Sequence, residues 1–80
     1  MKFSAAPAII NGACPSETVL NQLAAALLAR GCKILRIGTF AVSAEADDIV
    51  YRQLQQDHGK DDLSILDALY VAQPPIFFGP

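Results

Sequence analysis

The segment 16–30 is the strongest constraint on how this chain can fold, because its apolar residues recur at the spacing of one helical face. Those residues are Leu20, Leu23, Ala24 and Leu27, and the pattern predicts an amphipathic helix. Pro15 suits the first turn, and Arg30 followed by Gly31 is typical of a helix end. Such a helix must bury its apolar face against another layer of secondary structure.

The segment 32–42 supplies a second layer. It is rich in branched and aromatic residues, namely Ile34, Leu35, Ile37, Phe40 and Val42, which predicts a strand that is buried on much of both faces. A shorter strand that begins with a proline is predicted at residues 7–10. If these two strands pair in parallel, the helix between them makes a right-handed crossover.

Two more helices are predicted in the second half of the chain. Ser43 suits an N-cap, and the helix after it would run to His58-Gly59 and bury Ala46, Ile49, Val50 and Leu54. A third helix would start at Asp61 or Asp62 and end at Pro74-Pro75, with an apolar face of Leu63, Leu66, Leu69 and Tyr70.

The last apolar residues, Ile76, Phe77 and Phe78, form a strand or an apolar tail. The order of elements is then β-α-β-α-α-β within one domain of residues 1–80. We expect a small two-layer domain of the α/β or α+β class, with three helices on a short sheet of two to four strands.

The composition indicates that part of the surface faces a partner. Apolar residues make up 52% of the chain and charged residues only 18%, and a domain this small buries only about 60% of the surface that its unfolded chain exposes. Each large side chain of the apolar tail would stabilise by about 1.5–3 kcal/mol if it were buried. The tail could close the core, pair with a second copy in a homodimer or enter the groove of a partner.

The charges are divided along the chain. Residues 1–44 carry four cations and one acid, and residues 45–80 carry seven acids and two cations. We expect an acidic helical face whose candidate contacts are Glu45, Asp47, Asp48, Asp61 and Asp62. Such a face favours a partner protein with a basic surface, for instance one that itself binds nucleic acid, and it disfavours direct binding of nucleic acid. A solvated helical flank is the simpler interpretation of each acid taken alone.

Cys14 provides an alternative function. It lies between a predicted strand and a predicted helix, where the helix dipole and free amide groups stabilise a thiolate or bind an anion, and Gly12, Cys14 and Ser16 would form that site. The Cys14-Pro15 step resembles the active site of glutaredoxins, over the first half of the chain, which implies a small thiol-dependent enzyme. Glu17 stands where that family has a second cysteine, and no later segment matches the strand on which the family binds its thiol partner. A small apolar residue in a loop corner is the structural alternative.

Other chemistry is not indicated by the sequence. His58 lies near Asp57, Asp61 and Asp62, but Lys60 among them favours a surface turn over a metal site. No segment has the ~20 continuous apolar residues of a membrane helix, and the first residues do not fit a signal peptide. We therefore expect a cytoplasmic protein without a cofactor or metal. Its two cysteines, Cys14 and Cys32, are more simply interpreted as free thiols than as one disulfide bridge.

Taken together, these patterns predict a non-enzymatic protein-binding module, an accessory or inhibitor protein that docks its acidic helical face and apolar surface on a larger protein. Phage-encoded inhibitors such as anti-CRISPR proteins share this size and character. A small enzyme centred on Cys14 is the alternative.

Overall fold

The computed structural model describes residues 1–8 and 15–71. In chain order its elements are β1 (Lys2–Pro7), α1 (Glu17–Ala29), β2 (Lys33–Ile37), β3 (Val42–Glu45), α2 (Asp48–Asp57), a short 3-10 helix η1 (Asp61–Leu63) and β4 (Leu66–Val71).

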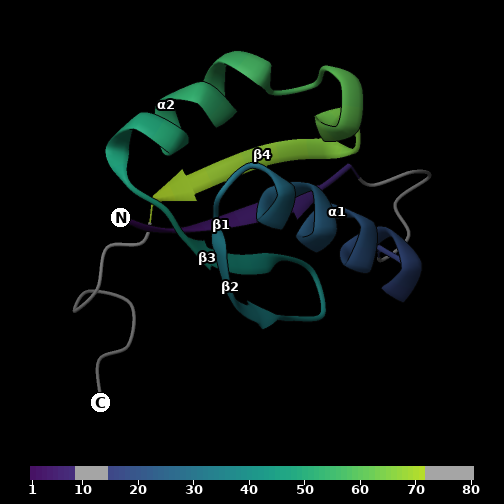
Figure 1. Ribbon diagram of the computed structural model, residues 1–80. Coiled ribbons are helices and arrows are strands. Elements are labelled where there is room, and N and C mark those ends of the chain that lie inside the picture. The colour runs from purple at the N-terminus through teal and green to yellow at the C-terminus, as the bar shows by residue number, and fades with distance from the viewer. Residues whose placement is uncertain (9–14, 72–80) are drawn as a thin grey trace.

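The strands form one antiparallel sheet in the order β2-β3-β1-β4, and Figure 1 shows them in that order from bottom to top. β1 and β2 run in the same direction with β3 between them, so β1, α1 and β2 form a split βαβ unit. β3, α2 and β4 form a second such unit, because β3 and β4 run in the same direction with β1 between them. Each of these split βαβ units is bridged by one helix, which is the connectivity of the ferredoxin-like fold. An α+β domain with helices on a short sheet is confirmed. Parallel pairing of the first two strands is wrong, because β3 separates them.

Both helices cover the same face of the sheet. On β1, the alternate residues Phe3, Ala5 and Pro7 are buried, as a strand with one covered face requires. Phe3 and Ala5 belong to one buried cluster with the apolar faces of α1 and α2. The ring of Phe3 meets Tyr51 of α2 edge to face, with 5.2 Å between the ring centroids, an arrangement that aromatic pairs favour. Ser4, which lies between Phe3 and Ala5 on β1, belongs to the other face of the sheet.

Local signals fix α1 at both ends, and the predicted helix is confirmed. The side chain of Ser16 accepts a hydrogen bond from the backbone N–H of Val19 at 3.2 Å, which satisfies one free donor of the first turn. After Arg30, Gly31 has φ +99°, a backbone conformation that residues other than glycine rarely adopt. This turn sends the chain back to the sheet and leaves the Arg30 side chain at the end of the helix.

In place of the single strand predicted at 32–42, the chain forms β2, a turn at residues 38–41 and then the start of β3, and β2 and β3 make a hairpin. Gly38 donates its N–H to the carbonyl of Ala41 at 2.8 Å, across the turn. Burial on much of both faces is wrong for the first arm, because β2 lies at the edge of the sheet and only Ile34 in it is even half-buried. The first strand of the chain is Lys2–Pro7, so of the strand predicted at 7–10 only Pro7 lies in a strand, and residues 9 and 10 lie outside the described residues. Pro7, which lacks an N–H, stands at its end.

The second helix starts later than the sequence suggests. Ser43 lies in β3, opposite Ser4 of β1, and Asp47 is the N-cap, with its Oδ1 accepting from the N–H of Val50 at 2.8 Å. Its end is confirmed, since α2 stops at Asp57 and His58 is the C-cap.

The third predicted helix is wrong, and the domain has two α-helices instead of three in the part described. Asp61 has a φ of +47°, and after the single turn of η1 the chain forms β4, which pairs with β1. The spacing of Leu63, Leu66 and Leu69 fits a helix as well as it fits this turn and strand. The pairing with β1 decides in favour of the strand. On the side of β1 that faces away from β3, the backbone N–H and C=O groups need partners, and β4 supplies them.

Candidate functional site

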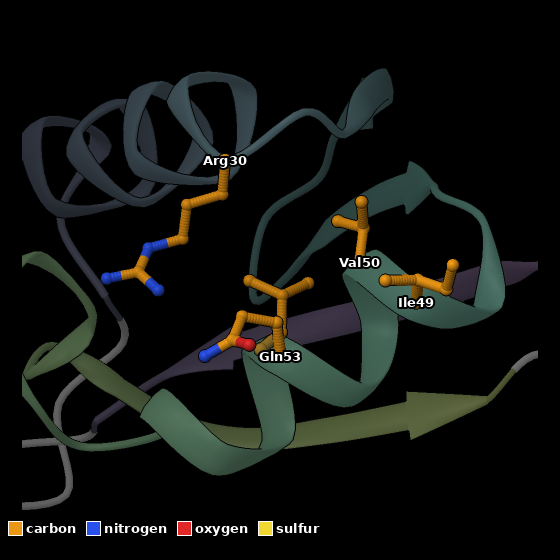
Figure 2. A pocket seen from close by; sticks show the side chains of 5 residues that line it. Arg30, Ile49, Val50 and Gln53 are labelled. Carbon is orange, nitrogen blue, oxygen red and sulfur yellow. The ribbon is translucent and has the colours of Figure 1, made fainter.

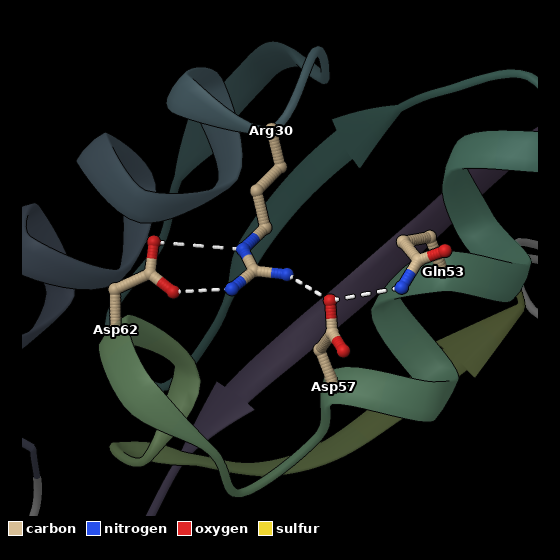
Figure 3. Close-up of polar contacts among 4 residues, drawn as sticks. All are labelled: Arg30, Gln53, Asp57 and Asp62. Carbon is tan, nitrogen blue, oxygen red and sulfur yellow. Dashed lines mark hydrogen bonds and ion pairs between the residues drawn. The ribbon is translucent and has the colours of Figure 1, made fainter.

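Arg30 joins the end of α1 to α2 and to η1 (Figure 3). Its Nε and Nη2 donate to the two carboxylate oxygens of Asp62, at 3.5 and 2.5 Å, and its Nη1 donates to Oδ2 of Asp57. The same oxygen of Asp57 accepts a hydrogen bond from Nε2 of Gln53 at 3.1 Å. One guanidinium therefore ties the end of α1 to the end of α2 and to η1, whose aspartates follow it by 27 and 32 positions in the sequence, a task for which its planar fork is well suited.

The charges of this cluster stabilise one another. Hydrogen bonds from Gln53 and Arg30 hold the pKa of the Asp57 carboxyl below its ordinary value, and the hydrogen bonds from Arg30 do the same for Asp62. The hydrogen bond to Asp62 raises the pKa of Arg30 in turn. The side chains are 21% (Arg30), 29% (Asp57) and 48% (Asp62) exposed, so solvent screens the pairs and the cluster acts mainly as a brace between segments.

A hollow of about 260 Å³ opens beside this brace, between α1 and α2 (Figure 2). Arg30, Ile49, Val50, Gln53 and Leu54 line it. Leu54 is fully buried and Val50 is half-buried, whereas Ile49 is 79% exposed. Pockets for small-molecule ligands usually measure about 300–1,000 Å³. This hollow is smaller than most of them, and its lining is largely aliphatic.

The exposure of Ile49 contradicts its predicted place in the buried face of the second helix. The buried residues of α2 are Tyr51 and Leu54. Ile49 precedes Tyr51 by two positions, which is about 200° around a helix, so its side chain points away from the core. The signal for this lies in the sequence, in the three-residue spacing of Tyr51 and Leu54.

The structure brings two of the predicted acidic contacts next to Ile49. Asp47, the N-cap, and Asp48, the first residue of α2, are both exposed. Carboxylates at this end of a helix are favoured by its dipole. The first turn of α2 thus combines two acidic side chains with one large exposed apolar side chain.

The other predicted acidic contacts lie elsewhere. Glu45 is half-buried on β3, with Lys2 of β1 and Lys33 of β2 as its neighbours in register, where opposite charges stabilise a sheet. Asp61 and Asp62 belong to η1, beyond the far end of α2, and Asp62 is paired with Arg30. The five acids therefore do not form one continuous helical face, and the predicted helix that was to carry the last two is absent.

The residues of the alternative thiol site are only partly described. Gly12 and Cys14 lie outside the described residues, and so does the predicted tail contact of Ile76, Phe77 and Phe78. Ser16 caps α1. The other cysteine, Cys32, is buried in the core, where loss of solvation raises the pKa of its thiol, as expected of a structural residue.

Within residues 1–8 and 15–71, no three His, Cys, Asp or Glu side chains are grouped as a metal ion would need. Neither helix in these ranges has the length and apolar character to cross a membrane. Comparisons of the chain with models of protein families, with curated proteins and with solved structures find no match in any of the three.

Proposed function

We propose that this chain is a protein-binding module without enzymatic chemistry, which docks on a basic surface of a larger protein. The contact is made by the α2 patch, which we define as Asp47, Asp48, Ile49, Val50 and the hollow beside them. The observation that carries the proposal is Ile49, which is 79% exposed. Full burial of such a side chain stabilises by about 1.5–3 kcal/mol, most of which is available only when a partner covers it.

The chemistry of the partner follows from the surroundings of Ile49. An apolar side chain from the partner would fill the hollow against Val50, and lysine or arginine side chains around it would face Asp47 and Asp48. Charge complementarity of this kind speeds association and fixes orientation. Proteins that bind nucleic acid carry such basic surfaces, and an accessory or inhibitor protein could cover one.

Two substitutions in the patch, each with a matched control on α1, test the proposal. Ile49→Ser removes the exposed apolar group, and Leu28→Ser does the same on α1, where Leu28 is 61% exposed. Asp48→Lys reverses a charge on the first residue of α2, and Glu17→Lys reverses one on the first residue of α1. Asp48 and Glu17 hold the first position of their helices, so their reversals lose a similar helix-dipole contribution, and Ile49 and Leu28 are both largely exposed, so neither serine opens the core. A difference in capture within either pair therefore reports on the patch.

The measurement is quantitative capture of proteins from an extract of the native host by the immobilised chain and its four variants. A partner that binds through the patch is retained by the native chain and both controls, and it is lost with Ile49→Ser and Asp48→Lys. If every retained protein binds the patch variants as well as the controls, the α2 patch is not the docking site.

A further inference from the structure

The two edges of the sheet differ in their protection against pairing with another strand. At the β2 edge, the register to β3 shifts between Ile34 and Arg36, which leaves Leu35 without a partner. Lys33 and Arg36 add two positive charges to this short strand. Bulges and cationic side chains are the usual devices that prevent a sheet edge from recruiting further strands.

The β4 edge lacks these devices along most of its length. Its pairing with β1 is regular from Ala68 to Val71, and the register shift falls before that, next to Asp67. No residue from Ala68 to Val71 is charged, and Tyr70 and Val71 are 59% and 46% exposed. Among the described residues β4 has a neighbour on one side only, so alternate N–H and C=O groups on its other side are open to a further strand.

A second hollow lies beside the same edge. It measures about 230 Å³ and is lined by Leu69 of β4, by Gln55 of α2 and by His58, the C-cap of α2. Strand addition combines main-chain hydrogen bonds with pockets that take side chains from alternate positions of the new strand. The β4 edge offers both.

We propose that β4 pairs with β4 of a second copy of this chain, antiparallel and about a twofold axis, so that the two four-stranded sheets become one. A second copy fits because the strand is uncharged from Ala68 to Val71 and meets no like charge on itself. The assembly also closes at two copies, since each copy then turns its protected β2 edge outward. In a register centred on Leu69, the large Tyr70 lies opposite the partner's Ala68.

This interface is separate from the α2 patch. The β4 pairing uses the edge of the sheet, whereas the patch lies at the start of α2 and between the helices. The dimer can therefore exist if the proposed function is wrong, and the reverse also holds.

Sedimentation equilibrium of the native chain over a wide range of concentrations tests the dimer. We expect a reversible dimer. Tyr70→Lys should raise its dissociation constant about tenfold or more, because the substitution brings two cations into one interface. Leu35→Lys, the matched control on the β2 edge, should leave the constant unchanged. Far-UV circular dichroism of both variants should be native, since each side chain is exposed.

Three results would overturn the proposal: a native chain that stays monomeric up to millimolar concentration, a Tyr70→Lys variant that still dimerises, or a dimer that only Leu35→Lys disrupts. The register has its own test in a Cys14→Ser background. Ala68→Cys mixed with Tyr70→Cys should give disulfide-linked mixed dimers in excess of either linked homodimer under mild oxidation. An absence of mixed dimers would contradict the pairing.

Discussion

Leu27 and Leu54 are both fully buried, yet we expect their replacement by alanine to have different costs. Each substitution removes three carbons, which costs about 2.4 kcal/mol at about 0.8 kcal/mol for each carbon withdrawn from the core. Leu27 lies in the core under α1, and an enclosed cavity there should raise its total to about 3–5 kcal/mol. Leu54 lines the hollow of about 260 Å³, so the void left by Leu54→Ala joins a space that already exists. The cost of that substitution should therefore stay at about 2.5 kcal/mol.

Urea unfolding followed by far-UV circular dichroism measures this difference. A domain of 80 residues has a total stability of about 4–12 kcal/mol, so both variants should remain folded enough to give a baseline if the native chain lies in the upper half of that range. The protein concentration must be the same in every experiment, because dimer formation would add to the apparent stability. The expected gap is about 0.5–2.5 kcal/mol with Leu27→Ala the less stable. If Leu54→Ala costs as much as Leu27→Ala at equal urea dependence, the hollow is not a solvent-accessible space and cannot take a side chain of a partner.

The remaining predictions concern the brace and the turns. The pKa values of Asp57 and Asp62 are lowered in the folded state, so these carboxylates stabilise the fold at any pH above their ordinary pKa of 3.8, and the stabilisation is lost as falling pH protonates them. Arg30→Gln should therefore lower the urea midpoint at neutral pH. In acid, the midpoints of the variant and the native chain should converge. Gly31→Ala should cost about 1–2 kcal/mol in urea unfolding, because φ is +99° although the new methyl has room. Asp47→Ala should cost about 1 kcal/mol through loss of the cap, while Asp47→Asn keeps the cap and removes the charge, so it should retain stability and weaken capture of a basic partner.

What the sequence predicts correctly is what depends on neighbouring residues. The end of α1 follows from Gly31, and the end of α2 follows from the turn at His58 and Gly59. In each case the conformation of one residue or the hydrogen bond of one side chain decides where the helix stops, with little influence from the rest of the molecule.

What the sequence does not predict depends on contacts between distant residues. The segment that forms β4 has a spacing that also fits a helix, and only its pairing with β1, some sixty residues earlier, selects the strand. The Arg30 brace joins residues 27 and 32 positions apart, and no local pattern marks such a pair. Asp48 and Asp62 are separated by the length of α2, since Asp48 is its first residue and Asp62 follows its end.

The buried cluster also changes the meaning of the apolar composition. Five of its members are alanines, namely Ala5, Ala24, Ala26, Ala44 and Ala46, and an alanine removes far less apolar surface from water than a leucine does. Small side chains on β1, β3 and α1 allow α1 to lie close to the sheet, so the core closes without several of the large apolar residues. Ile49, Leu28, Phe40 and Tyr70 remain exposed as a result. The high apolar fraction of this chain therefore places several large apolar side chains on its described surface instead of in the core. Because Ile49 and Tyr70 lie on different elements, substitutions at the two should act independently on capture and on dimerisation.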